Sequence, residues 1–165
     1  MTLHTGDWIL ILDFGSQYTQ LIARRVRELN VYCEIHPFNT APHSFDDRPP
    51  KGIILSGGPS SVYDEDAPEL NLDYFDLDVP VLGICYGLQS LAHAIQPGAV
   101  EKAKKREFGR ATLLVDDSSD LLKDLESQST VWMSHGDHIK KLPDSYKTIA
   151  HTSNAPVAAV RHKSK

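Results

Sequence analysis

The sequence has little of several features that mark common classes of protein. It has two cysteines, Cys33 and Cys85, in 165 residues, too few for a disulfide-held secreted domain of this size. No apolar run approaches the roughly 20 residues that cross a bilayer. Segment 1–7 is short and polar and lacks the apolar stretch of a secretory signal. These absences predict a cytoplasmic protein with free thiols and no membrane partner.

Positive charge is also in short supply. Lys and Arg number 17 against 22 Asp and Glu, which gives a formal net charge of −5 at pH 7. Proteins that bind nucleic acid usually carry a basic surface, so we expect no nucleic-acid partner. The remaining composition, 41% hydrophobic and 24% charged, is that of an ordinary globular protein, and the length suits one domain over residues 1–165.

Short apolar runs alternate with helical patterns in the first part of the chain. Runs that are apolar on both faces are typical of strands buried in a parallel sheet. We expect such strands at 8–12, 31–37, 52–55 and 79–84. One helix should follow the first run, with Ser16 as a possible cap and Asn30 at its end, and another should cover 86–95. Short strands are expected at 111–115, 131–133, 148–151 and 157–160. The pattern predicts an α/β fold in three layers, with a mostly parallel sheet and helices on both faces.

Three segments rich in glycine or polar residues follow predicted strands directly. They are Asp13-Phe14-Gly15-Ser16, Ser56-Gly57-Gly58-Pro59 and Cys85-Tyr86-Gly87. Ligands of parallel sheets bind at the carboxyl ends of the strands. We therefore expect these three segments to line one crevice, with Cys85 and Gly58 less than about 10 Å apart, because an oxyanion donor must reach the reacting oxygen.

The run Gly83-Ile84-Cys85-Tyr86-Gly87 has the form G-x-C-x-G between an apolar strand and a helix. It is the thiol counterpart of the nucleophile elbow, a sharp turn that exposes the nucleophile in a strained backbone conformation. The flanking residues must be small, and the helix N-terminus favours the thiolate. We interpret Cys85 as the nucleophile, although a buried structural cysteine is the alternative. Cys33 lies in a strand-like run, and we interpret it as structural.

A thiol that attacks an acyl group also needs hydrogen-bond donors for the oxyanion. The N–H of Tyr86, directly after the nucleophile, is one candidate. The Gly57-Gly58 pair is the other, because glycines let a backbone N–H approach the substrate. A plain tight turn is the alternative for this pair. A phosphate-binding P-loop is excluded because no Gly-Lys-Ser/Thr follows.

These motifs together resemble the class I glutamine amidotransferases. Gly57-Gly58-Pro59 and Gly83-Ile84-Cys85-Tyr86-Gly87-Leu88-Gln89 are similar to the family's two N-terminal signatures. Further stretches resemble the GMP synthase branch of the family. They are 13–20, 24–28, Arg106-Glu107-Phe108-Gly109 and Met133-Ser134-His135-Gly136-Asp137. The resemblance implies a flavodoxin-like fold of the class I amidotransferase type.

The resemblance implies a role for each matched residue. Cys85 would attack the side-chain amide of glutamine, and the N–H groups of Gly58 and Tyr86 would hold the oxyanion. The substrate would be bound by Gly57, Gln89, Ser134, His135, Gly136 and Asp137. Glutamine would yield glutamate and ammonia, and a synthetase outside this chain, either a fused domain or a separate subunit, would aminate XMP to GMP with ATP and Mg²⁺. The resemblance implies no cofactor or metal in this domain, and a possible homodimer of the full-length enzyme.

The sequence departs from the family in one respect. The family takes its acid–base histidine and the orienting carboxylate from a His-Pro-Glu that does not occur here. We therefore expect the C-terminal part of the fold to be incomplete, the chain to be a fragment, and the fragment alone to be inactive. His151 and His162 are expected to lack an adjacent orienting carboxylate, so neither is expected to be the base. His93 is expected to be inert, and 135–138 is a poor metal site because further ligands are missing.

Two other functions remain open at this point. One is another thiol-dependent amidase, against which the stretches at 13–20 and 133–137 count. The other is a catalytically incomplete glutamine-binding domain, which the missing His-Pro-Glu favours. Whether the synthetase is fused to this domain or separate is open too.

Overall fold

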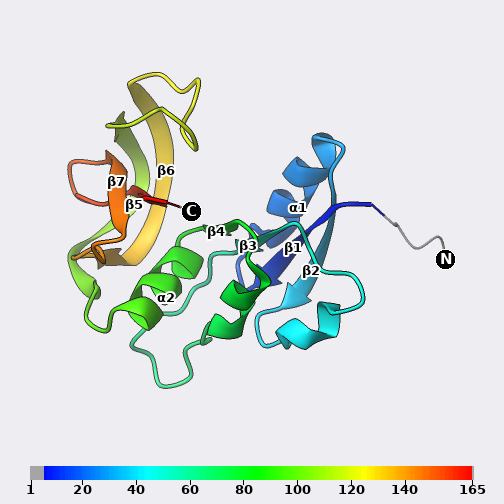
Figure 1. Ribbon diagram of the computed structural model, residues 1–165. Coiled ribbons are helices and arrows are strands. Elements are labelled where there is room, and N and C mark those ends of the chain that lie inside the picture. Colours follow the sequence, from blue (N-terminus) through cyan, green and yellow to red (C-terminus); the bar gives the residue numbers. More distant parts are fainter. Residues whose placement is uncertain (1–5, 165) are drawn as a thin grey trace. The chain divides into compact units, whose positions relative to one another are not determined.

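A computed structural model describes residues 6–164, apart from the side chains of residues 103–108 and 135. The chain divides into two compact units, Met1–Ala94 and Ile95–Lys165. Each unit has its own sheet and is described by itself (Figure 1).

The first unit is built on a four-stranded parallel sheet. Its strands are β1 (Trp8–Asp13), β2 (Tyr32–Pro37), β3 (Gly52–Leu55) and β4 (Val81–Gly83), in the order β2-β1-β3-β4. The helices are α1 (Thr19–Glu28) and α2 (Tyr86–Ile95), and two short 3₁₀ segments are η1 (Pro42–Phe45) and η2 (Leu72–Leu77). The predicted strand 79–84 is shorter than expected. It lies at one edge of this sheet and is half-buried rather than buried.

Successive residues of β1 point to opposite faces of the sheet and build two separate cores. Ile11 packs with Ala23 of α1 and Cys33 of β2. Leu10 and Leu12 belong to the larger core on the other face, which also contains Tyr86 and Leu91 of α2 and Tyr74 of η2. Helices therefore cover both faces of a parallel sheet, which confirms the predicted α/β class.

Helix α1 begins and ends almost where the sequence predicted. Asn30 follows the helix with φ of 59°, the left-handed conformation that ends many helices. The predicted cap is wrong, however. Tyr18 holds the cap position without a side-chain hydrogen bond, and the Ser16 hydroxyl instead accepts a hydrogen bond from the Tyr18 N–H at 3.0 Å.

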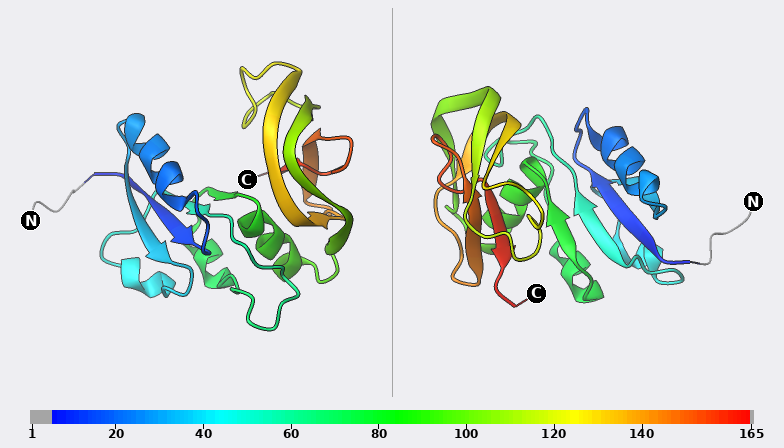
Figure 2. Two further views of the ribbon diagram at one scale, coloured as in Figure 1. Left: turned by 180° about the vertical axis from the view of Figure 1, so that it is seen from behind. Right: turned by 90° about the horizontal axis from the view of Figure 1, so that it is seen from above.

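The second unit is an antiparallel sheet in the order β6-β5-β7-β8. Its strands are β5 (Val100–Val115), β6 (Gln128–Ile139), β7 (Tyr146–His151) and β8 (Ala159–His162). Figure 2 shows β5 and β6 as long curved strands that run side by side. The predicted strands 111–115 and 131–133 cover only parts of them, because charged and polar residues elsewhere in both strands hide the alternation on which prediction rests.

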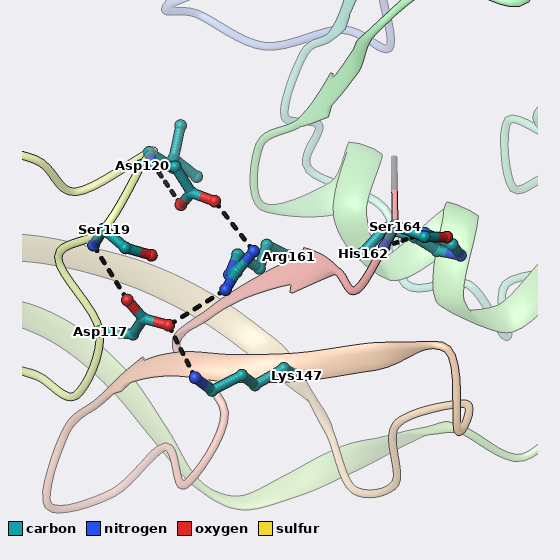
Figure 3. A network of polar contacts seen from close by, with 8 residues as sticks. Asp117, Ser119, Asp120, Lys147, Arg161, His162 and Ser164 are labelled. Atoms are coloured by element: carbon teal, nitrogen blue, oxygen red, sulfur yellow. Dashed lines mark hydrogen bonds and ion pairs between the residues drawn. The ribbon is translucent and has the colours of Figure 1, made fainter.

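A network of ion pairs joins the last two strands to the loop after β5. The Asp117 carboxylate lies 2.7 Å from Lys147 Nζ and 3.3 Å from an Arg161 guanidinium nitrogen, and it accepts the Ser119 N–H at 2.9 Å (Figure 3). Arg161 also pairs with Asp120 at 3.1 Å. The hydrogen bond from Lys147, and after it the hydrogen bonds from Ser119, hold the pKa of the Asp117 carboxyl well below its usual range.

Over residues 6–164, no helix is long and apolar enough to cross a membrane.

Candidate active site

The carboxyl ends of β1 and β3 are joined by polar contacts. The Ser56 hydroxyl accepts the Phe14 N–H at 3.0 Å, and the Ser56 N–H donates to the Leu12 carbonyl at 3.0 Å. The Asp13 carboxylate turns the chain into α1 by accepting the Gly15 N–H at 2.9 Å and the Thr19 hydroxyl at 2.8 Å. Two of the three predicted segments therefore meet at the carboxyl ends of the central strands.

The third segment is a sharp turn between β4 and α2. Cys85 has φ of 50°, in the left-handed region that side-chain-bearing residues rarely adopt. This confirms the strained backbone predicted for a nucleophile elbow. The turn is held to β3 by two hydrogen bonds, from the Ile84 N–H to the Leu55 carbonyl at 2.9 Å and from the Gly87 N–H to the Ser56 carbonyl at 3.0 Å.

The two elbow glycines are required by close packing. A Cβ on Gly83 would lie 2.9 Å from the Leu88 backbone, and a Cβ on Gly87 would lie 2.5 Å from the Leu55 carbonyl oxygen. Both distances are too short for a side chain. The prediction that the residues flanking Cys85 must be small is confirmed.

The glycine loop after β3 lies against the cysteine. A Cβ built on Gly57 would be 3.5 Å from Cys85 Cβ and 3.6 Å from Ser16 Oγ. Gly58 is the next residue, one Cα spacing of about 3.8 Å further along, so it lies well inside the predicted 10 Å from Cys85. Gly58 itself must lack a side chain because the Phe14 carbonyl oxygen would be 2.5 Å from its Cβ. The three predicted segments thus converge around Cys85.

The thiol of Cys85 is exposed, whereas its neighbours in α2 are buried. Tyr86 is 1% exposed, and its hydroxyl donates to the Pro68 carbonyl at 2.7 Å. Gln89 is 7% exposed, and its backbone N–H donates to the Cys85 carbonyl at 3.0 Å. The start of α2 is therefore held rigidly while the thiol remains open to solvent.

Cys33 has the opposite environment. Its side chain is fully buried between β2 and α1, and its thiol donates to the Ala23 carbonyl at 3.4 Å. Burial raises the pKa of the Cys33 thiol. A protonated, inaccessible thiol is not a nucleophile, which confirms the structural interpretation.

The predicted substrate residues from 134 to 137 belong to the second unit. They lie on β6, where Ser134 pairs with Phe108 and Asp137 pairs with Lys102 of β5. Asp137 is buried, at 6% exposure. The side chain of His135 lies outside the described residues, so its predicted role stays a prediction, as do those of Ser134, Gly136 and Asp137.

The structure corrects one expectation about the histidines. His151 does have a carboxylate partner, because its Nδ1 lies 2.8 Å from Asp116 Oδ2, although the two residues are distant in sequence. His162 instead packs edge-on against Tyr146, and His93 of α2 packs edge-on against Tyr63. Among the residues that the structure describes, no group of three or more His, Cys, Asp or Glu could hold a metal ion.

The residue that sequence reasoning missed is Ser56. Ser56 begins the segment Ser56-Gly57-Gly58-Pro59, in which the sequence predicted a role for the two glycines only. Ser56 is fully buried. Its hydroxyl contacts the Phe14 N–H at the end of β1, and its carbonyl contacts the Gly87 N–H in the elbow. A serine directly after an apolar strand, before two glycines, was the available signal.

Comparison with known proteins agrees with this geometry. The class-I glutamine amidotransferase family matches residues 10–165. The chain is 53% identical to a GMP synthase (glutamine-hydrolysing) of Desulfotalea psychrophila over 167 aligned positions, which cover 100% of this chain and 32% of that protein. It is 52% identical to the enzyme of the same name from Gloeothece citriformis, over 92% of this chain and 28% of that protein. The chain therefore spans about a third of the length of these relatives.

Solved structures support the same assignment. A Thermoplasma acidophilum protein, described as one subunit of a GMP synthase, matches with a TM-score of 0.81 and 31% identity, over 99% of this chain and 81% of that one. A glutamine amidotransferase of Thermotoga maritima shares the fold at 17% identity, with a TM-score of 0.70 over 96% of this chain and 73% of that one. The family match over residues 10–165, together with the elbow and the glycine loop, shows that the chain belongs to the class-I glutamine amidotransferase family.

Proposed function

We propose that this chain is the glutaminase part of a GMP synthase and that Cys85 is its nucleophile. The single observation that carries the proposal is the exposed thiol of Cys85 at φ of 50°, with Gly57 packed beside it. A strained, exposed position that two sterically required glycines maintain is typical of a nucleophile elbow.

The reaction follows from this arrangement. The Cys85 thiolate attacks the side-chain carbonyl carbon of glutamine, and the carbonyl π electrons move to the oxygen. The N–H groups of Gly58 and Tyr86 stabilise that oxyanion. Collapse of the intermediate expels ammonia after proton transfer to nitrogen and leaves a γ-glutamyl thioester, which water hydrolyses to glutamate and free thiol.

Binding of glutamine is assigned to further residues of the same signatures. The residues assigned to it are Gly57, Gln89, Ser134, His135, Gly136 and Asp137. The proton donor for the leaving ammonia is not assigned to this chain, because residues 1–165 contain no His-Pro-Glu.

The ammonia would pass to a synthetase site that uses ATP and Mg²⁺ to aminate XMP to GMP. Support comes from relatives about 50% identical that are named glutamine-hydrolysing GMP synthases and of which this chain covers 28–32%. The synthetase domain or subunit is therefore the main proposed protein partner, and the cytoplasm is the proposed location.

Substitution of Cys85 tests the proposal in the complete enzyme. Cys85→Ala should abolish glutamine-dependent GMP formation and leave ammonia-dependent formation intact, because free ammonia bypasses the thiol. Cys33→Ala is the matched control and should retain both activities. Glutamine-dependent turnover by Cys85→Ala would show that Cys85 is not the nucleophile, and loss of both activities would show a structural role.

A further inference from the structure

The second oxyanion donor needs something to orient it. Gly58 contributes its N–H through the peptide that joins it to Gly57, and neither glycine has a side chain to anchor that peptide. Glycine is also the residue with the greatest backbone freedom. An unanchored Gly-Gly peptide would spend part of its time with the N–H turned away from the site.

The Ser56 hydroxyl supplies the anchor. It donates to the Gly57 carbonyl oxygen at 2.9 Å. In a trans peptide the C=O and the following N–H point in opposite directions, and the described residues contain no cis peptide bond. Holding the Gly57 carbonyl on Ser56 therefore sets the direction of the Gly58 N–H. No group in the described part of the chain accepts a hydrogen bond from that N–H.

Ser56 is itself held in place by its surroundings. It is fully buried, and each of its own polar groups has a partner in a neighbouring element. The backbone N–H donates to Leu12, the carbonyl accepts from Gly87, and the hydroxyl oxygen accepts from Phe14. The first and last partners lie at the end of β1, and Gly87 belongs to the elbow.

The hydroxyl proton has a second possible acceptor, and distance decides between them. Asp13 Oδ1 is 3.5 Å from Ser56 Oγ, whereas the Gly57 oxygen is 2.9 Å away. Hydrogen bonds between oxygens usually span about 2.5–3.0 Å. The same Asp13 oxygen already accepts the Gly15 N–H and the Thr19 hydroxyl. The proton therefore belongs to the Gly57 carbonyl.

We propose that Ser56 is a positioning residue for glutamine hydrolysis: its hydroxyl locks the Gly57–Gly58 peptide so that the Gly58 N–H faces the thiol of Cys85. This inference rests on the proposed function. The Ser56 hydroxyl contacts the peptide that carries the oxyanion donor and the Phe14 N–H, and as a positioning residue it acts on glutamine only through that donor. It should affect the transition state, in which the oxyanion forms, more than the binding of glutamine.

The test measures glutamine hydrolysis and Cys85 alkylation in the complete enzyme carrying Ser56→Ala. Loss of a whole oxyanion donor costs about 100- to 1,000-fold in kcat. A donor that remains but turns freely should cost less, so we expect kcat to fall about 10- to 100-fold, with KM changed by less than about threefold. Ser60→Ala makes the same change in the same loop and should leave kcat unchanged.

Alkylation by iodoacetamide separates positioning from general damage. The thiolate of Cys85 forms the S–C bond as iodide leaves with the electrons of the C–I bond, so no oxyanion develops. We expect Ser56→Ala to leave this rate within about twofold of wild type. Ser56→Cys keeps the size of the side chain with a weak donor. It should give an intermediate kcat, and it carries the test if Ser56→Ala does not fold.

Each other result overturns the inference in a distinct way. If Ser56→Ala or Ser56→Cys keeps kcat within twofold, the hydroxyl does not position the donor. If kcat and alkylation fall together, Ser56 supports the elbow as a whole. If the wild-type enzyme fails to hydrolyse glutamine, the proposed function fails first.

Discussion

Gly87 is the position where the elbow depends most directly on packing. A Cβ there would lie 2.5 Å from the carbonyl oxygen, 2.8 Å from the carbonyl carbon and 2.7 Å from the Cβ of Leu55. Leu55 is 1% exposed and lies in β3, paired with strands on both sides. Neither it nor its backbone can move aside. Gly87→Ala must therefore displace the start of α2.

The expected loss of stability is the difference between the free-energy cost of overpacking and the gain in helix propensity. Overpacking a well-packed site costs about 1–3 kcal/mol, and a clash with backbone belongs at the upper end. Alanine gains at most about 1 kcal/mol over glycine in helix propensity. The net loss is about 2 kcal/mol, which corresponds to a melting temperature lower by about 4–8 °C in a protein of this size. The shifted elbow also lengthens the hydrogen bond from Gly87 to Ser56, and a displacement of about 1 Å at a catalytic site can cost about 100-fold in rate.

Thermal unfolding of residues 1–165 would measure the first effect, and glutaminase assays of the complete enzyme would measure the second. Gly57→Ala is the matched control, because its Cβ would meet Cys85, Ser16 and Ile84 only at 3.5–3.8 Å. It should keep the wild-type melting temperature while its methyl group crowds the thiol and lowers kcat at least about tenfold. Wild-type stability and activity in Gly87→Ala would refute the packing argument.

Three further predictions concern the rest of the chain. Burial raises the pKa of the Cys33 thiol above its unfolded value. The contribution of this thiol to stability is therefore complete below about pH 8.5 and is lost as pH rises through the folded pKa. In urea unfolding, the free energy of unfolding should fall less between pH 7 and pH 10 for Cys33→Ala than for wild type. The pKa of the Asp117 carboxyl is lowered, so its contribution to stability is present above about pH 4 and is lost as pH falls. Asp117→Asn should therefore lower the melting temperature at pH 7. An equal or larger decrease in melting temperature at pH 2–3 would contradict this. Residues 1–165 alone should hydrolyse glutamine far below about 1 s⁻¹, and a longer chain with a His-Pro-Glu should be faster; a normal rate from residues 1–165 would point to a histidine of this chain as the base.

The first unit could be predicted in detail because its signals are local. The strand 52–55 and the helix 86–95 match β3 and α2 residue for residue, since apolar runs bounded by glycine and polar turns have few alternatives. The elbow could be predicted for a similar reason. Its glycines surround one cysteine at a spacing that only a sharp strand-to-helix turn requires.

The contacts that the sequence could not provide are those between distant segments. Ser56 meets Phe14, and Asp116 meets His151, across 42 and 35 residues of chain. Their pairing depends on strand register rather than on sequence spacing. The predicted cap of α1 was wrong for a local reason. The Ser16 hydroxyl accepts a hydrogen bond from the N–H of Tyr18, two residues further on and before the first residue of the helix.

Covalent labelling of the cysteines with a glutamine-like electrophile tests the central claim most directly. Peptide mapping by mass spectrometry should find the label on Cys85, which is exposed, and none on Cys33, which is buried. Excess glutamine should slow the labelling, because both molecules compete for one site, and labelling should abolish glutamine-dependent activity in proportion to its extent. Equal labelling of both cysteines, or labelling of Cys85 that glutamine does not slow, would contradict the assignment of Cys85 as the nucleophile of a glutamine site.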